Sequence, residues 1–123
     1  MKVSVGRRFR FDAAHWLPDY NGPCSSLHGH SFFVEVRVNG EVNPVSGMLV
    51  DFAWLKKCFE GVTGDMDHHC LNDVLINPTA ELIAGLLFRR VKEEWIQSPD
   101  EAVQLESVRV YETPDSYAEV TND

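Results

Sequence analysis

Alternating apolar and polar residues predict strands near both ends of the chain. Residues 31–38 alternate, with Phe32, Val34, Val36 and Val38 at every second position against polar partners such as Glu35 and Arg37. Because successive side chains of an extended chain point to opposite faces, this is the pattern of a half-buried strand. Residues 3–14 alternate more loosely, and residues 105–112 and 116–120 flank the turn-forming residues 113–115. The pair Asn39-Gly40, which is common in tight turns, is expected to end the second strand.

Apolar residues spaced by three and four predict two helices in the middle of the chain. Asp51 is the expected N-cap of the first helix, because its carboxylate can accept from free amides of the first turn. Asn77-Pro78 is expected to open the second helix, since proline is tolerated in the first turn. The two apolar stripes are Phe52, Leu55, Phe59 and Val62, then Leu82, Ile83, Leu86, Leu87 and Val91. Residues 98–100 (Ser-Pro-Asp) are expected to break the chain after the second helix.

The resulting element order is ββααββ, which predicts an α+β domain spanning residues 1–123. The expected architecture is a four-stranded antiparallel sheet with two helices on one face. The chain has 123 residues and a net charge of −8, with 19 acidic and 11 basic residues. We therefore expect no nucleic-acid partner, because no basic footprint is visible. No apolar run reaches the roughly 20 residues of a membrane span, and the start of the chain lacks a signal-peptide core, so a cytoplasmic protein is expected.

The cysteine content argues against disulfides and against a cysteine-rich structural zinc site. The chain has three cysteines, Cys24, Cys58 and Cys70, and no two of them form a C-x-x-C pair. Free thiols in a reducing compartment are therefore expected. Cys58 falls on the amphipathic helix and is predicted to lie in the core, and Cys70 is predicted to be structural.

Three histidines form a candidate metal site. His28 and His30 flank Gly29 at the start of the second strand, so their side chains should point to the same face. His15 ends the first strand and can reach the same point if the two strands pair. Three imidazoles with one open position are typical of catalytic zinc. Spacing alone also allows a different interpretation, in which these are surface histidines or histidines satisfied within the core.

Further residues could transfer protons or bind a ligand. Cys24 precedes His28 by four residues, so it is a candidate base or nucleophile, or else a passive loop thiol. In Asp67-His68-His69, a carboxylate beside an imidazole can fix its tautomer, but a solvated polar loop explains the same residues. Glu112 could bind adjacent N–H donors of a ligand, or could simply be a turn carboxylate.

Six segments, taken together, resemble the 6-pyruvoyltetrahydropterin synthase superfamily, and most closely the 6-carboxytetrahydropterin synthases of queuosine and 7-deazaguanine biosynthesis. They occur in the family's order and span almost the whole chain. The segments are residues 11–15 (FDAAH), 24–30 (CSSLHGH), 48–52 (MLVDF), 66–73 (MDHHCLND), 77–81 (NPTAE) and 110–114 (VYETP).

The resemblance implies roles for particular residues. The metal ligands would be His15, His28 and His30, with Zn²⁺ as the cofactor. Cys24 would be the catalytic cysteine, and Asp67 with His68 would be the proton-relay pair. Glu112 would hold the amino-pyrimidine edge of a pterin, and Thr79 would lie near the same ring; His69 falls at a variable position.

The resemblance also implies the reaction and the assembly. The substrate would be 7,8-dihydroneopterin triphosphate, and the products 6-carboxytetrahydropterin, acetaldehyde and triphosphate. The family's tunnelling fold forms a homohexamer, a dimer of trimers with active sites between subunits. Competing functions are formation of the 6-pyruvoyl product, side-chain cleavage of dihydroneopterin, and a non-catalytic zinc- or pterin-binding module. The cations available for the triphosphate are Lys2, Arg7, Arg8, Arg10, Lys56 and Lys57.

Overall fold

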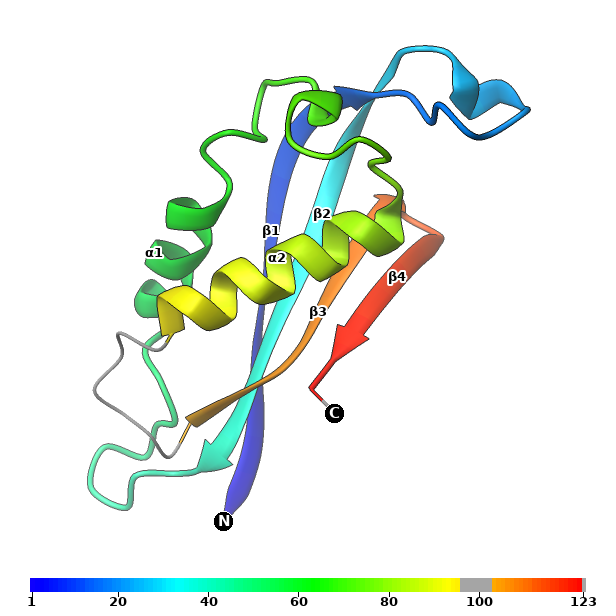
Figure 1. Ribbon diagram of the computed structural model, residues 1–123. Helices are drawn as coiled ribbons and strands as arrows, with labels where there is room; N and C mark the ends of the chain where they lie inside the picture. Colours follow the sequence, from blue (N-terminus) through cyan, green and yellow to red (C-terminus); the bar gives the residue numbers. More distant parts are fainter. Residues whose placement is uncertain (96–102, 123) are drawn as a thin grey trace.

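The fold is an antiparallel sheet with two helices packed on one of its faces (Figure 1). The computed structural model describes residues 1–95 and 103–122, with nothing described of the Trp95 side chain. Its strands and α-helices are β1 (Lys2–His15), β2 (His28–Glu41), α1 (Phe52–Val62), α2 (Ala80–Trp95), β3 (Val103–Thr113) and β4 (Ser116–Thr121). Two 3₁₀ turns are η1 (Pro23–Ser25) and η2 (Leu71–Asp73). The predicted break at residues 98–100 lies outside the described residues.

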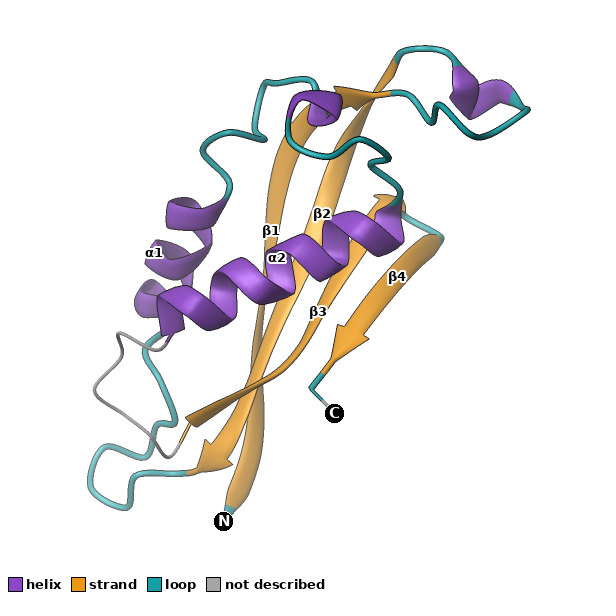
Figure 2. Cartoon of the chain, in the orientation of Figure 1, coloured by secondary structure: helices purple, strands orange, loops and turns teal. Residues whose placement is uncertain are grey.

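The four strands follow one another in space in the order β1-β2-β3-β4, and each neighbouring pair is antiparallel. Figure 2 shows α2 crossing the sheet, with α1 on the same side. Helix α2 packs on β3 and β4, and α1 lies beside β1. The predicted α+β class and the ββααββ order are therefore confirmed. Within the described residues, no helix is long and apolar enough to cross a membrane.

The core lies between the sheet and the two helices. Its sheet side comes from alternating strand residues, which include Phe11, Phe32, Val34, Val36, Val38, Leu105, Val108 and Val110. Its helix side includes Leu55, Phe59, Val62, Ile83, Leu87 and Val91. Among the described residues, no α-helix covers the opposite face of the sheet (Figure 2), and this bare face carries polar and aromatic side chains.

The expected turn at Asn39-Gly40 was wrong. Both residues lie inside β2, opposite Ser4 and Val3, because β1 extends far enough to pair with them. The chain reverses a few residues later, where the Asn43 side-chain oxygen accepts from the amide of Val45 at 2.8 Å. A strand can continue through a turn-forming pair when the neighbouring strand supplies hydrogen-bond partners for it. Here, pairing with β1 outweighed the turn preference of Asn39 and Gly40.

The helix predictions were mostly confirmed, with exceptions in the first turns. Asp51 caps α1, since its carboxylate accepts from the amide of Ala53 at 2.8 Å, and Cys58 is buried as predicted. Phe52 and Leu82 were wrongly placed in the core, because their exposed fractions are 55% and 49%. Each lies in the first turn of its helix. The apolar three-and-four spacing includes both residues, but the buried part of each helix begins after them.

The start of α2 also differs from the prediction. The helix begins at Ala80, and the Thr79 hydroxyl accepts from the amide of Leu82 at 3.1 Å, which is the geometry of an N-cap. Pro78 therefore lies before the helix rather than in its first turn. This shift leaves the Pro78 carbonyl free to bind another group.

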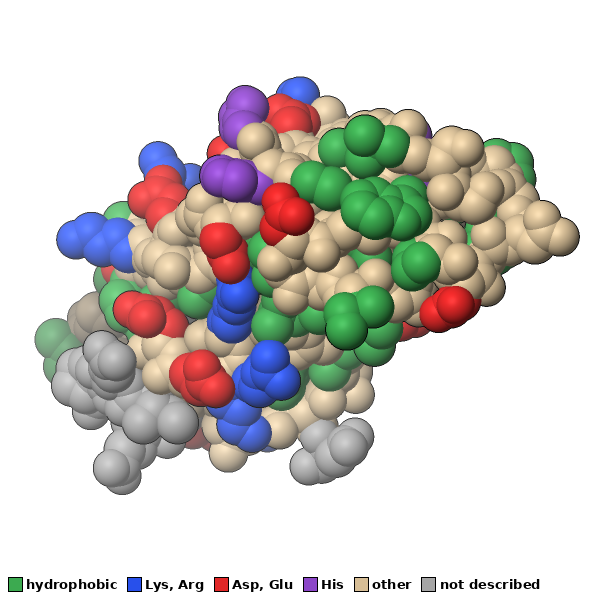
Figure 3. All heavy atoms as spheres, turned by 45° about the horizontal axis from the view of Figure 1, so that its top comes forward, with side chains coloured by type: hydrophobic (Ala, Val, Ile, Leu, Met, Phe, Trp, Pro, Cys, Tyr) green, Lys and Arg blue, Asp and Glu red, His purple; other side chains and the backbone are tan. Residues whose placement is uncertain are grey.

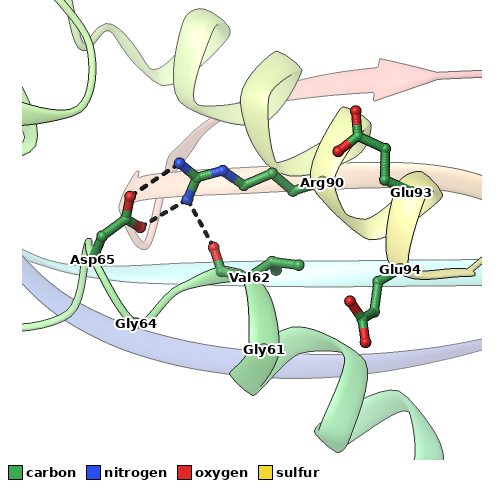
Figure 4. Close-up of a pocket in the computed structure, with 7 residues that line it drawn as sticks. All are labelled: Gly61, Val62, Gly64, Asp65, Arg90, Glu93 and Glu94. Carbon is green, nitrogen blue, oxygen red and sulfur yellow. Dashed lines mark hydrogen bonds and ion pairs between the residues drawn. The ribbon is translucent and has the colours of Figure 1, made fainter.

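An ion pair joins the end of α1 to α2 (Figure 4). The Arg90 guanidinium donates to both oxygens of Asp65, at 2.7 and 3.0 Å, and to the carbonyl of Val62 at 3.0 Å. The hydrogen bonds from Arg90 are the main reason that the pKa of Asp65 lies below its ordinary value. The contact thus fixes the last turn of α1 against α2.

We predict that Asp65→Asn lowers the free energy of unfolding at pH 7 by about 0.5–1 kcal/mol, the upper part of the range for solvent-exposed pairs. A carboxyl whose folded-state pKa is depressed stabilises the fold above its unfolded pKa and loses that contribution as the pH falls. The difference between wild type and variant should therefore shrink below the ordinary aspartate pKa of 3.8. Denaturant titrations at several pH values measure it, and a difference independent of pH would contradict the assignment.

Candidate metal centre and active site

The register of β1 and β2 brings the three predicted ligand histidines onto one face of the sheet. His15 lies directly opposite His28, and Ala13 lies opposite His30. Opposed residues of an antiparallel pair share a face, so all three imidazoles lie on the helix-covered side, next to Phe32. The ring centroids are 4.7 to 5.2 Å apart.

Backbone carbonyls orient two of these imidazoles. The Nδ1 atom of His15 lies 2.8 Å from the carbonyl of Pro78, and Nδ1 of His28 lies 2.7 Å from the carbonyl of Ser26. A carbonyl only accepts, so each Nδ1 carries the proton and each Nε2 presents a lone pair. The Pro78 carbonyl is available for this because α2 starts after it.

The arrangement fits a metal ion by its donor set. Within the described residues, the Nε2 atoms of all three histidines are buried and have no hydrogen-bond partner. The ligand atoms of His15, His28 and His30 all lie within 4.8 Å of one another. Buried polar atoms are nearly always paired in native proteins, so three converging unpaired acceptors call for a cation. Three imidazole nitrogens suit zinc with an open fourth position.

Glu112 lies beside the same centre. One of its carboxylate oxygens is 3.4 Å from Nε2 of His15, at the end of β3. A carboxylate oxygen facing an imidazole lone pair is repulsive unless a proton or cation lies nearby. The position of Glu112 thus agrees with a cation among the histidines, and it places a carboxylate where a ligand at the open position could meet it.

Burial affects the protonation of one ligand. Removal from water lowers the pKa of His30 below its ordinary value, and the nearby charge of Glu112 opposes this effect. The neutral imidazole is the form that binds a metal. The surroundings of His30 therefore favour the ligand state.

Cys24 lies in η1, within the loop that joins the two ligand strands. Its carbonyl accepts from the amide of Leu17 at 2.9 Å, and the residue is partly buried. The loop packs closely at Gly22, where an added Cβ would lie 2.5 Å from the ring of Tyr20. Among the described residues, the group of converging metal-ligand atoms does not include Cys24.

Asp67 and His68 lie along the free edge of β1. His68 Nδ1 is 3.0 Å from an Asp67 carboxylate oxygen, and the His68 side chain is 77% exposed. The amide of Ala14 donates to the carbonyl of His69 at 3.1 Å, so the segment continues the sheet by a short pairing. Asp67 and His68 form a second cluster with Asp12, and this cluster shares no residue with the three histidines in the described chain.

A hollow lies beside the cluster of Asp12, Asp67 and His68. Its volume is about 620 Å³, and the residues that line it include Asp12, His30, Ser31 and His68. Figure 3 shows exposed histidine side chains among acidic and basic ones at this end of the molecule. Asp12 falls within segment 11–15, but the sequence predicted no role for it. The carbonyls of Pro78 and Ser26 were not predicted either, because backbone acceptors and register contacts leave no local motif.

Several of the remaining candidate residues already have partners. The Thr79 hydroxyl caps α2, and Arg7 donates to the carbonyl of Phe52 at 3.0 Å. Arg10 is engaged by Asp12, and Arg8 stacks on the rings of Phe33 and Tyr111. Three of the six basic residues expected to meet a triphosphate therefore already contact other groups of the chain.

Comparison with known proteins agrees with this architecture. The family model for 6-pyruvoyl tetrahydropterin synthase matches residues 4–123. A 6-carboxy-5,6,7,8-tetrahydropterin synthase of Synechocystis is 38% identical over 93% of this chain and 89% of the relative. A dihydroneopterin monophosphate aldolase of Pyrococcus furiosus is 40% identical over 76% of this chain and 78% of the relative.

A solved structure shares the fold over the whole chain. The 6-pyruvoyl tetrahydropterin synthase of Caenorhabditis elegans superimposes with a TM-score of 0.87 at 28% identity, covering 100% of this chain and 97% of that one. The expected tunnelling fold is therefore confirmed. With a family model matching nearly the full length, this chain belongs to the 6-pyruvoyl tetrahydropterin synthase family of pterin synthases.

Proposed function

We propose that the protein is a zinc-dependent 6-carboxy-5,6,7,8-tetrahydropterin synthase. It would convert 7,8-dihydroneopterin triphosphate and water to 6-carboxytetrahydropterin, acetaldehyde and triphosphate, in queuosine or 7-deazaguanine biosynthesis. The observation that carries the proposal is the convergence of three unpaired Nε2 atoms beside the carboxylate of Glu112. The choice of product is supported by the names of two relatives that are 34% and 38% identical to this chain over their aligned residues.

His15, His28 and His30 would hold the zinc ion. When bound, zinc supplies a Lewis acid that polarises the substrate's side chain and makes its carbon–hydrogen bonds more acidic. The protein's own part is to keep the three imidazoles neutral and aligned, which the carbonyls of Pro78 and Ser26 do for two of them.

The remaining site residues would bind the ring and move protons. Glu112 accepts hydrogen bonds from the amino-pyrimidine edge of the pterin, a set of adjacent N–H donors that suits a carboxylate. Thr79 directly follows Pro78, whose carbonyl holds His15. The Cys24 thiolate removes a proton from the side chain, and His68, oriented by Asp67, returns protons elsewhere.

We propose that residues 1–123 form one domain that assembles as a cytoplasmic homohexamer, a dimer of trimers. Two observations support an assembly. The histidine cluster and the Asp67–His68 cluster are separate within one chain. β1 and β4 are the outer strands of the sheet, so another copy could pair with β4 or with the part of β1 that precedes its contacts with residues 68–70.

Side-chain cleavage is a second candidate, because a relative named as dihydroneopterin monophosphate aldolase is 40% identical to this chain. That reaction also needs a metal-activated side chain and a base. Cys24 favours the synthase, since the cleaving relatives often carry glutamate at the corresponding place. Two further candidates are formation of the 6-pyruvoyl product and a purely zinc- or pterin-binding role.

The products distinguish these activities. We expect zinc-loaded protein incubated with 7,8-dihydroneopterin triphosphate to release acetaldehyde and triphosphate and to form the 6-carboxy pterin, as measured by mass spectrometry and a coupled aldehyde assay. Dihydroneopterin monophosphate should be turned over poorly. A pyruvoyl product alone would assign the 6-pyruvoyl activity instead, and release of glycolaldehyde phosphate from the monophosphate would assign side-chain cleavage. Absence of turnover would favour the binding module.

Metal binding is predicted to depend on the three histidines. His28→Ala should lower zinc affinity by more than the ~10–100-fold that losing a ligand's hydrogen-bond partner costs. His69→Ala is the matched control, because His69 is exposed and its Nδ1 contacts the carbonyl of Asp67 at 2.7 Å. Metal analysis and chelator competition measure both variants. Equal zinc content in the two would count against the assigned centre.

Cys24 is predicted to act in proton transfer and not as a ligand. Cys24→Ala should retain one zinc per chain and lose turnover by roughly 10²–10⁴-fold, the usual contribution of a positioned proton-transfer group. Zinc content and kcat are measured on the same preparation. If the metal content of Cys24→Ala fell to that of His28→Ala, the cysteine would be a ligand and its assigned role wrong.

A further inference from the structure

Asp12, on the bare face of the sheet, has contacts that the family roles do not use. It lies in β1 directly opposite Ser31, at the point where the free edge of β1 meets the segment carrying Asp67 and His68. Both its main chain and its side chain take part in hydrogen bonds with functional neighbours. The two sets of contacts act on the same pair of residues.

The main chain of Asp12 holds the pair in place. Its amide donates to the Asp67 oxygen Oδ1 at 3.0 Å, and its carbonyl accepts from the amide of His68 at 2.6 Å. The same Asp67 oxygen faces Nδ1 of His68. One residue of a rigid strand therefore fixes both the carboxylate that orients the imidazole and the backbone that carries it.

The backbone of His68 needs this support. With φ of 61°, it is the one non-glycine residue of the described chain in the left-handed region. That conformation is unfavourable for a residue with a side chain and persists where surrounding contacts hold it, often at functional sites. The hydrogen bond to the Asp12 carbonyl is such a contact.

The side chain of Asp12 is itself fixed. Its Oδ1 accepts from the Ser31 hydroxyl at 2.6 Å and from Arg10 Nε at 3.2 Å, and Arg10 Nη2 donates to the Ser31 hydroxyl at 3.1 Å. These donors, Ser31 first, lower the pKa of Asp12 and keep it ionised. An oxygen of Asp12, an oxygen of Asp67 and a nitrogen of His68 all lie within 4.8 Å of one another.

Two carboxylates thus face one imidazole. Asp67 contacts Nδ1, and an oxygen of Asp12 lies within 4.8 Å of the pair, so both carboxylates attract an Nδ1–H donor toward the strand. The ring is 77% exposed, so Nε2 is left for a substrate in the hollow that Asp12, Ser31 and His68 line. A proton donor is effective only when its orientation is held.

We propose that the carboxylate of Asp12, held by Arg10 and Ser31, is a positioning group for His68, on a strand whose main chain already fixes Asp67 and the backbone of His68. The expected change in kcat rests on the proposed function. The structural part, which is the effect of Asp12 on the imidazole of His68, does not. Asp12 acts through His68, whose exposed Nε2 is the atom presented to a substrate.

The test compares the zinc-loaded full chain with Asp12→Ala, Asp12→Asn and the control Ser4→Ala. Ser4 lies on the same face at the opposite end of β1, where its hydroxyl donates to Glu106 at 2.7 Å. Asp12→Ala is expected to lower kcat about 10-fold, a fraction of the contribution of the proton-transfer group itself, with KM and bound zinc unchanged. Asp12→Asn, which keeps an acceptor oxygen for Ser31 and Arg10, should recover part of that loss.

A second readout does not depend on turnover. The imidazole ¹⁵N shifts of His68, assigned by their loss in His68→Gln, should move at fixed pH in both Asp12 variants and stay at the wild-type values in Ser4→Ala. Unchanged shifts with unchanged kcat would overturn the proposal, as would an Asp12→Ala defect explained by lost zinc or lost folding. If the wild-type protein does not turn over dihydroneopterin triphosphate, the proposed function fails, and the shifts alone decide the coupling of Asp12 to His68.

Discussion

The pairing register between β1 and β2 is the constraint on which the site depends. It places His15 opposite His28 and Ala13 opposite His30, so three imidazoles converge on the covered side of the sheet. A shift of one residue would turn the histidines of one strand to the opposite face. The long ladder, continuous from Lys2 to His15, and the stacked pair Phe11–Phe32 resist such a shift because they bury apolar side chains on the same face.

Bringing three unpaired imidazole nitrogens together costs free energy, and the groups around the histidines reflect this cost. Three buried nitrogens without partners would be unfavourable in a protein that holds nothing there. Carbonyls of Pro78 and Ser26 bind the opposite nitrogens and so fix which atoms face the centre. Glu112 lies near the end of β3, two strands away from β1, and its carboxylate places a negative charge beside His15. Fold, tautomer and charge at this centre all favour a bound cation.

The bare face and free edge of β1 serve a separate purpose. Even-numbered residues of β1 point away from the metal side, and among them Asp12 joins Arg10 and Ser31 in a polar network. The segment of Asp67 and His68 is bound to this edge by main-chain contacts. The same strand therefore supports the ligand cluster on one face and orients the proposed proton donor from its edge.

The sequence by itself determined the α+β class, the order of elements, the N-cap at Asp51 and the identity of the clustered histidines. These follow from local periodicity and from side-chain chemistry, which act over a few residues. Its errors at Asn39-Gly40, Phe52 and Leu82 arose where pairing or the limit of a buried surface outweighed a local preference.

Only the tertiary structure decided how the site is supported. The contacts of His15 with Pro78, of Asp67 with Asp12 and of Glu112 with His15 join residues 40 or more positions apart. Such contacts depend on strand register, on where a helix starts and on backbone carbonyls that every residue possesses. For that reason no spacing in the sequence marked Asp12, while the three-dimensional arrangement places it beside His68.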